Sequence, residues 1–214
     1  TPFSSCSKPT QCSRRTLRSA LENSARNEEL TALIAATPET ERRDMEYLIA
    51  YMPDFDRESM NLELLKENVA YANLVREKYT WTKELPEEVY MRDVLPYYVV
   101  DEVRDSWRKE LYELFAPAVD TCQTMYEAIC AVNANIPRLT GVDYNTKREK
   151  TNQSPRESMR QGMASCTGLS ILLVDAYRAV EFAYLFEVKY DEATYKEYAT
   201  IVCQGGKGEY WTYE

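Results

Sequence analysis

The chain has 214 residues, of which 44% are hydrophobic, and this is enough for one large domain or two small ones with a sizeable core. Its net charge is −9, and an acidic surface repels phosphate backbones and anionic lipid, which argues against binding to nucleic acid or to a membrane surface. Only 6 glycines are present, too few for an all-β architecture rich in tight turns.

The first residues, 1–13, are polar and rich in serine, and we expect a flexible tail. Cys6 and Cys12 could pair within it. Phe3-Ser4-Ser5-Cys6 is similar to the end of a bacterial lipoprotein signal, in which the cysteine is lipidated, so a lipid anchor is one expectation. No later stretch is long and apolar enough to span a bilayer.

Residues 14–140 show apolar positions at helical spacing, which predicts a helical region. Thr37-Pro38-Glu39 is typical of an N-cap, a first-turn proline and an early acidic residue, and indicates a helix that ends near Pro53. The remaining elements expected here are helices, namely 17–34, 59–81, a short one after Pro86 that ends before Leu95, 105–115 and 120–136.

The segment 141–180 carries the clearest local patterns. Val142 to Tyr144 predicts a short edge strand. Ser154-Pro155-Arg156-Glu157 is a complete capping-box sequence, and Gly162 is a natural C-terminal glycine for the helix it begins. Ser165 is placed to cap the next helix, which puts Cys166 in its first turn and runs to Val180.

From Phe182 the apolar period changes from that of a helix to that of a strand. Three strands are expected, at 182–190, 198–203 and 210–213, with a glycine-rich turn before the last.

The chain has six cysteines and no histidine, and these are the residue types that commonly bind zinc. No pair of cysteines has CxxC spacing, so neither a metal site nor a cofactor is predicted. Cys122 and Cys130 lie about 12 Å apart along one predicted helix and cannot bridge each other.

Cys166 is the candidate catalytic residue. The start of a helix favours a thiolate, and its exposed N–H groups suit the oxyanion that forms in acyl transfer. The alternative is a small core cysteine that happens to precede a helix, since free cysteines are often buried and inert.

The residues around Cys166 support the catalytic interpretation. Asn145 to Ser158, then Gly162-Met163-Ala164-Ser165-Cys166-Thr167-Gly168-Leu169-Ser170, and finally Asp175 to Val180 closely resemble the transglutaminase-like superfamily, in particular its bacterial extracytoplasmic members. The resemblance is specific over 141–180. It is looser upstream, at Leu95-Pro96-Tyr97 and from Glu102 to Arg108.

The resemblance implies an α+β fold, in which an N-terminal helical region packs on a cysteine-proteinase-like core with a short antiparallel sheet. It implies a papain-like triad in which Cys166 attacks a peptide or protein amide through a thioester, with a His and an Asp on neighbouring strands. Gln153 and Arg178 match motif positions to which we assign structural roles. An extracytoplasmic location is implied as well.

The chain departs from that pattern after Val180, where it runs directly into Glu181-Phe182-Ala183 and supplies no histidine. Three explanations stay open: a non-catalytic relative, a fragment, or residues missing between Val180 and Glu181. The predicted organisation is therefore a tail (1–13), a helical region (14–140) and a transglutaminase-like core (141–214) that is incomplete after residue 180. Two functions follow, cysteine acyl transfer or amide hydrolysis, and a non-catalytic binding or scaffold module.

Overall fold

The structure is a computed structural model that describes residues 9–180, 184–191, 196–204 and 210–213. Side chains are described between residues 16 and 180, except for residue 84. The contacts of the chain divide it into two compact units, Thr1–Val69 and Ala70–Glu214.

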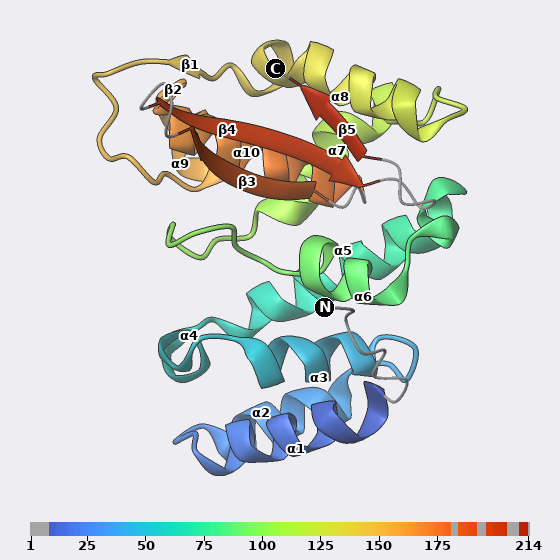
Figure 1. Ribbon diagram of the computed structural model, residues 1–214. Coiled ribbons are helices and arrows are strands. Elements are labelled where there is room, and N and C mark those ends of the chain that lie inside the picture. The colour runs from blue at the N-terminus through green and yellow to red at the C-terminus, as the bar shows by residue number, and fades with distance from the viewer. Residues whose placement is uncertain (1–8, 181–183, 192–195, 205–209, 214) are drawn as a thin grey trace. The chain divides into compact units, whose positions relative to one another are not determined.

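The first unit is built from helices. They are α1 (Pro9–Glu22), α2 (Asn27–Ala36), α3 (Arg42–Tyr51), α4 (Asp54–Ser59) and the first half of α5 (Leu62–Lys78) (Figure 1). Helices α1 and α2 both pack against α3, and Leu30, Ile49 and Leu65 are fully buried. Helix α1 begins at Pro9, earlier than the predicted boundary at Arg14, and residues 1–8 lie outside the described part.

The predicted N-cap at Thr37 is wrong. Thr37 is the C-cap of α2, where its hydroxyl donates to the Leu33 carbonyl over 2.8 Å. A turn follows, and α3 begins only at Arg42. A threonine hydroxyl bonds backwards to the i−4 carbonyl as readily as it caps forwards, so the local sequence alone does not decide between the two.

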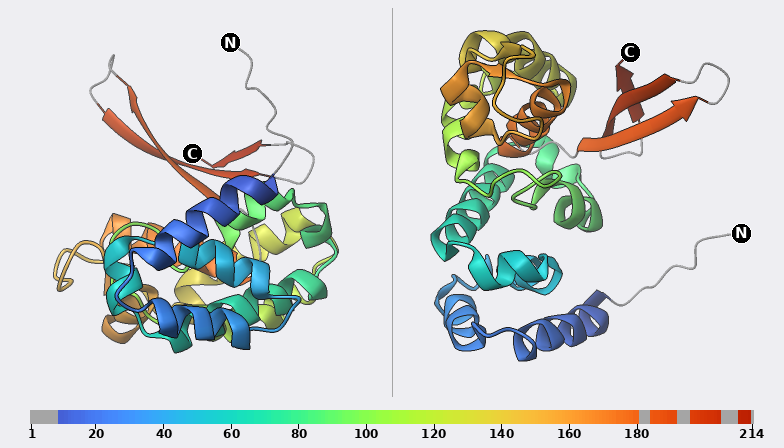
Figure 2. Two further views of the ribbon diagram at one scale, coloured as in Figure 1. Left: turned by 90° about the horizontal axis from the view of Figure 1, so that it is seen from below. Right: turned by 90° about the vertical axis from the view of Figure 1, so that its left-hand side faces the viewer.

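The second unit contains the rest of α5 and seven further helical segments. They are η1 (Trp81–Glu84), α6 (Glu87–Val89), the π-helical turn η2 (Tyr90–Val94), α7 (Trp107–Val119), α8 (Met125–Thr140), α9 (Pro155–Gln161) and α10 (Cys166–Ala179). Helix α10 packs against α7, α8 and α9 (Figure 2). Its residues Leu172, Ala176 and Ala179 are completely buried in the core of this unit. The predicted short helix after Pro86 is confirmed as α6 followed by η2.

The capping signals between residues 154 and 166 are confirmed. The Ser154 hydroxyl accepts from the Glu157 amide, while the Glu157 carboxylate accepts from the Ser154 amide. Gly162 ends α9 with a φ of 64°, a left-handed conformation that favours glycine. Ser165 caps α10, so Cys166 is its first residue, as predicted.

Five strands are described. The predicted edge strand is β1 (Asp143–Tyr144), and it pairs in parallel with β2 (Met163–Ala164). The three predicted C-terminal strands are β3 (Tyr184–Asp191), β4 (Lys196–Gln204) and β5 (Tyr210–Tyr213), which pair antiparallel in the order β3-β4-β5. Their side chains lie outside the described part.

The predicted fold class is wrong. The described chain is mostly helical, and a cysteine-proteinase-like core with an antiparallel sheet is not what surrounds Cys166. The strands beside the first turn of α10 are the short parallel pair β1–β2. The apolar faces of α7 and α8 cover α10 instead, so helix-on-helix packing replaces the expected sheet.

Two further expectations concern the ends of the predicted regions. The proposed gap between Val180 and Glu181 falls at residues 181–183, which lie outside the described part. The predicted boundary at residue 140 coincides with the end of α8 at Thr140, whereas the contacts divide the chain at Val69.

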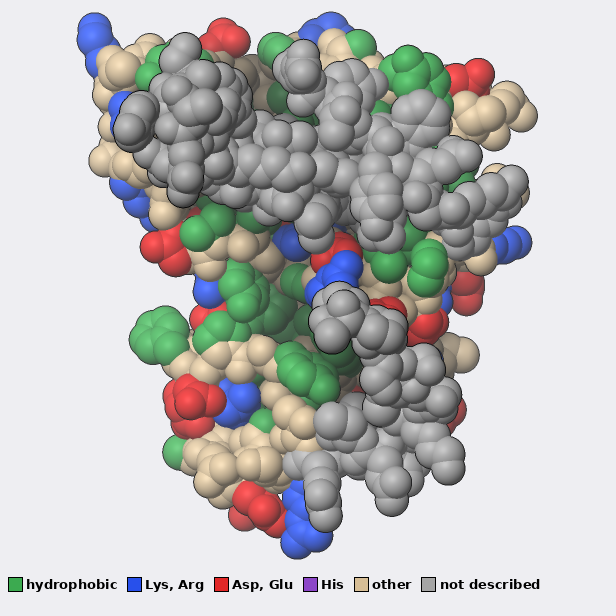
Figure 3. Space-filling view, in the orientation of Figure 1, with side chains coloured by type: hydrophobic (Ala, Val, Ile, Leu, Met, Phe, Trp, Pro, Cys, Tyr) green, Lys and Arg blue, Asp and Glu red, His purple; other side chains and the backbone are tan. Residues whose placement is uncertain are grey.

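The described surface carries charges of both signs. On the face shown in Figure 3, acidic and basic side chains are scattered among uncharged ones. Within the described residues, no helix is both long enough and apolar enough to cross a bilayer.

Candidate functional site

Cys166 is exposed at the first position of α10. The Ser165 hydroxyl accepts from the Gly168 amide over 2.9 Å and donates to the Thr151 carbonyl over 2.6 Å. Ser165 therefore caps the helix and also ties its first turn to the preceding loop. The thiol is held at a fixed and accessible place.

The backbone at this terminus provides hydrogen-bond donors. The first N–H groups of a helix have no acceptor within the helix. Ser165 accepts from the Gly168 amide, and the amides of Cys166 and Thr167, at the first two positions of the helix, have no acceptor within it. Together with the partial positive charge of the helix terminus, they suit a developing oxyanion.

Close packing holds strand β2, which directly precedes α10, against that helix. A Cβ at Gly168 would meet the Ala164 Cβ at 3.0 Å, so glycine permits the strand β2 to lie directly against α10. The Gln153 amide donates to the Met163 carbonyl over 3.1 Å from a fully buried position. This contact is of the structural kind assigned to Gln153 from the sequence.

A buried arginine pair anchors the other end of α10. Arg178 donates to the carbonyls of Asp93 and Tyr98, over 2.8 and 2.7 Å. Arg108 lies almost entirely buried and donates to the Arg178 carbonyl over 2.7 Å. Both side chains bind backbone, which is a structural role, and sequence reasoning overlooked Arg108 as the partner of Arg178.

Arg108 also donates to the carbonyls of the segment before α7, namely those of Val94, Leu95 and Pro96. It therefore joins that segment to the C-terminal end of α10.

Two carboxyl groups, the fully buried Asp175 and the half-buried Asp105, have raised pKa values. Burial raises the pKa of Asp175 well above its usual value, although Arg178 nearby acts in the opposite direction. Burial likewise raises the pKa of Asp105 to about 6, against the hydrogen bond from Ser154 and the charge of Arg156. Asp105 accepts that bond on one oxygen, and its other oxygen is buried without a partner.

Asp105 could not be found from the sequence. It contacts Ser154 from 49 positions away, and no short motif encodes a contact of that range. The capping box identified Ser154 correctly but gave no indication of the second bond that its hydroxyl makes.

The site contains a thiol and amides but no base. The chain has no histidine, and among the described residues the Cys166 thiol has no carboxylate as a hydrogen-bond partner. The described part also holds no group of acidic or cysteine side chains suited to a metal ion. Cys122 and Cys130 form no disulfide with each other, as predicted, but the predicted shared helix is wrong, because α8 begins at Met125 and Cys122 precedes it. The side chains of the other three cysteines lie outside the described part.

The arrangement can present a nucleophilic sulfur and stabilise an oxyanion, and it does not supply an imidazole to remove the thiol proton. Comparison with known proteins does not extend this conclusion, because no protein-family model, curated protein or solved structure matches the chain.

Proposed function

We propose that Cys166 is the nucleophile of an acyl-transfer site that acts on peptide or protein amides through a thioester. The observation that supports this proposal most is the exposed thiol at the first residue of α10, beside the amides of Cys166 and Thr167. The resemblance over residues 141–180 points to the same chemistry.

In the proposed step, the thiol loses its proton and the sulfur attacks the carbonyl carbon. A carbon–sulfur bond forms, and the carbonyl electron pair moves to oxygen, where the helix amides stabilise it. Collapse of this intermediate breaks the carbon–nitrogen bond, and the amine leaves with a proton taken from water. Water or a second amine then attacks the thioester, which yields an acid or a new amide and returns the thiol.

Because the chain contains no imidazole, the thiol proton passes to water in this scheme. Cysteine is the nucleophile least dependent on a neighbouring base, since part of it is ionised near neutral pH. The rate therefore depends on how strongly the helix terminus favours the thiolate.

The second candidate is a non-catalytic binding or scaffold module, and the absence of histidine specifically favours it. In that case Cys166 would be an ordinary exposed thiol whose helix serves only the packing of the unit. An extracytoplasmic location and a lipid anchor would suit either candidate, and both stay predictions.

Acylation of the native protein separates the two candidates. p-Nitrophenyl acetate transfers an acetyl group to a nucleophilic thiol and releases nitrophenolate, which is measured by absorbance, while peptide mass spectrometry locates the acetyl group. We expect acetylation at Cys166, loss of the fast phase in Cys166→Ser, and a rate several-fold lower in Ser165→Ala, since cap removal costs about 1 kcal/mol of helix-terminus stability.

Ser170→Ala is the matched control, because Ser170 lies one turn further along α10 and donates only to the Cys166 carbonyl. Its acetylation rate should equal that of the wild type. If Cys166 reacts no faster in the native chain than in the denaturant-unfolded chain, the scaffold interpretation holds and the acyl-transfer proposal fails.

A further inference from the structure

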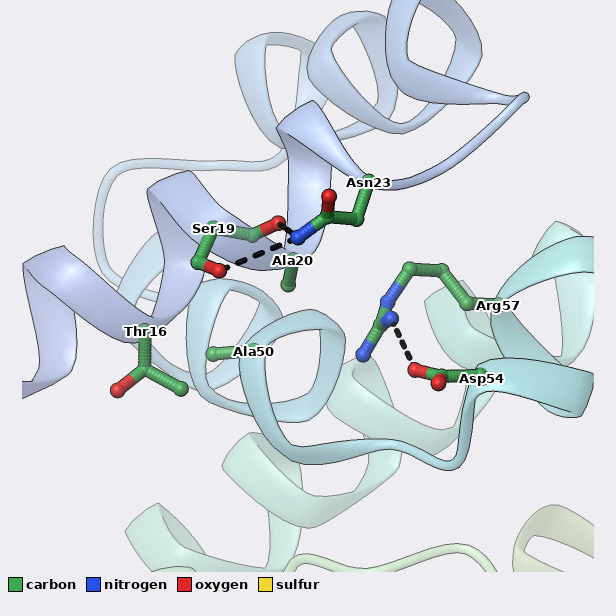
Figure 4. A pocket seen from close by; sticks show the side chains of 7 residues that line it. All are labelled: Thr16, Ser19, Ala20, Asn23, Ala50, Asp54 and Arg57. Atoms are coloured by element: carbon green, nitrogen blue, oxygen red, sulfur yellow. Dashed lines mark hydrogen bonds and ion pairs between the residues drawn. The ribbon is translucent and has the colours of Figure 1, made fainter.

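The first unit contains a pocket that no part of the Cys166 chemistry uses. It has a volume of about 540 Å³, and residues of α1, of the turn after α1, and of α3 and α4 line it (Figure 4). The lining residues are Thr16, Ser19, Ala20, Asn23, Ala50, Asp54 and Arg57. This volume falls within the range of small-ligand sites.

Arg57 gives the pocket its charge. Its side chain is only 8% exposed, and in Figure 4 it reaches from α4 toward Ala20 and Ala50. One terminal nitrogen donates to an Asp54 carboxylate oxygen over 2.6 Å, and the other donates to the Met52 carbonyl over 3.0 Å. The Nε atom is buried without a partner. A guanidinium has five N–H donors, so this buried cation has donor capacity left over.

Asp54 holds this guanidinium only loosely. The Asp54 side chain is 95% exposed, and an ion pair with so exposed a partner contributes little to stability. The Met52 carbonyl, in contrast, belongs to the backbone and keeps Arg57 in its orientation. Another carboxylate could therefore replace Asp54 without disturbing the position of the arginine.

The rest of the lining suits a small polar ligand. Ala20 and Ala50 present only methyl groups, which leave space beside the guanidinium. Asn23 lines the pocket and donates from its side-chain amide to the Ser19 carbonyl over 2.9 Å. The pocket thus combines a buried cation, small apolar walls and amide and hydroxyl groups, the combination with which proteins orient small ligands.

We propose that this pocket binds a small carboxylate-bearing ligand, whose carboxylate takes the place of Asp54 on the Arg57 guanidinium. The planar guanidinium matches a carboxylate in geometry, and partial burial strengthens the pair relative to one in water. Every residue involved belongs to the first unit, so the site is independent of Cys166 and stands whether or not acyl transfer occurs.

The test uses acetate as the probe and acetamide as its neutral isostere, with the full chain at constant ionic strength. Nuclear magnetic resonance follows the backbone amides of Ala20 and Ala50 and the Nε–H of Arg57. We expect acetate to shift these signals saturably and acetamide to leave them in place. Arg57→Lys keeps the charge but loses the planar fork, and its affinity for acetate should fall at least about fivefold.

Asp54→Asn removes the internal competitor at an exposed position, so it should fold normally and bind acetate at least about twofold more tightly. Arg26→Lys and Glu63→Gln are matched controls. Arg26 also bonds one carboxylate and one backbone carbonyl, and Glu63 is an exposed acid paired with Lys66. Neither control should change acetate binding. Equal shifts from acetate and acetamide, or affinity for acetate that Asp54→Asn leaves unchanged or lowers, would overturn the proposal.

Discussion

At the scale of single residues, the thiol of Cys166 and the carboxyl groups of Asp105 and Asp175 differ in their exposure to solvent. Cys166 is reachable from solvent, whereas Asp175 is fully buried and Asp105 is half-buried. These acids bond Ser154 and Arg178, which position the loop and helix that carry the thiol.

Asp105 predicts a specific dependence of stability on pH. Its pKa is raised to about 6 in the folded chain, whereas an unfolded Asp has a pKa of about 3.9. The folded state therefore holds the proton more tightly, so the contribution of Asp105 to stability is fully present below about pH 4 and is lost as the pH rises through about 6.

Denaturant unfolding of the wild type and Asp105→Asn between pH 4 and pH 7 tests this dependence. The asparagine cannot ionise but still accepts the bond from Ser154. Because all other groups are shared, the difference in unfolding free energy isolates this carboxyl. Asp105→Asn should gain about 2 kcal/mol relative to the wild type as the pH rises across this range, and a constant difference would contradict the assignment.

At the scale of elements, α10 is held at both ends by different means. Ser165 caps its first turn, and the buried guanidinium of Arg108 binds the carbonyl of Arg178 in its last turn. Arg108 also binds the carbonyls of the segment before α7, so one side chain joins two parts of the backbone.

Arg108→Met should therefore destabilise the protein by about 3 kcal/mol or more, because it leaves buried carbonyls without donors. Arg160→Met is the control, since Arg160 is exposed and lies 3.6 Å from an equally exposed Glu149. The control should change the free energy of unfolding by less than about 0.5 kcal/mol. Chemical denaturation of both variants measures the two effects, and similar losses would show that Arg108 does not act as an anchor.

The success of sequence reasoning at this scale depended on the range of the interaction. The caps at Ser154 and Ser165 join residues three apart, so the local sequence contains both partners, and both caps were predicted correctly. The N-cap prediction for Thr37 is wrong because a threonine hydroxyl can either accept from a following amide or donate to a preceding carbonyl. In the structure it donates to the Leu33 carbonyl. Arg108 and Asp105 could not be predicted, since their partners lie far away along the chain.

At the scale of the whole molecule, the pattern of elements was easier to predict than the way they pack. Strong helical periodicity and the alternating C-terminal strands gave the elements themselves. The fold class was wrong because the resemblance around Cys166 was extended to a sheet-covered core, whereas α7 and α8 cover α10. A motif of some forty residues determines a helix start but not what packs on that helix.

Folding of the second unit places Cys166 at the N-terminus of α10. The central claim is that this position makes the thiol more reactive than it is in the unfolded chain. Burial raises the pKa of the Cys122 thiol, which makes it a built-in reference for an ordinary, less reactive cysteine. The direct measurement is the rate of iodoacetamide alkylation of each cysteine at neutral pH, followed by peptide mass spectrometry in the folded and the denaturant-unfolded chain.

The account predicts that, at neutral pH, Cys166 is alkylated faster in the folded chain than in the unfolded chain, whereas Cys122, whose pKa is raised by burial, is alkylated more slowly in the folded chain. Equal alkylation rates of Cys166 in both states would contradict the account, because exposure alone would then explain its reactivity.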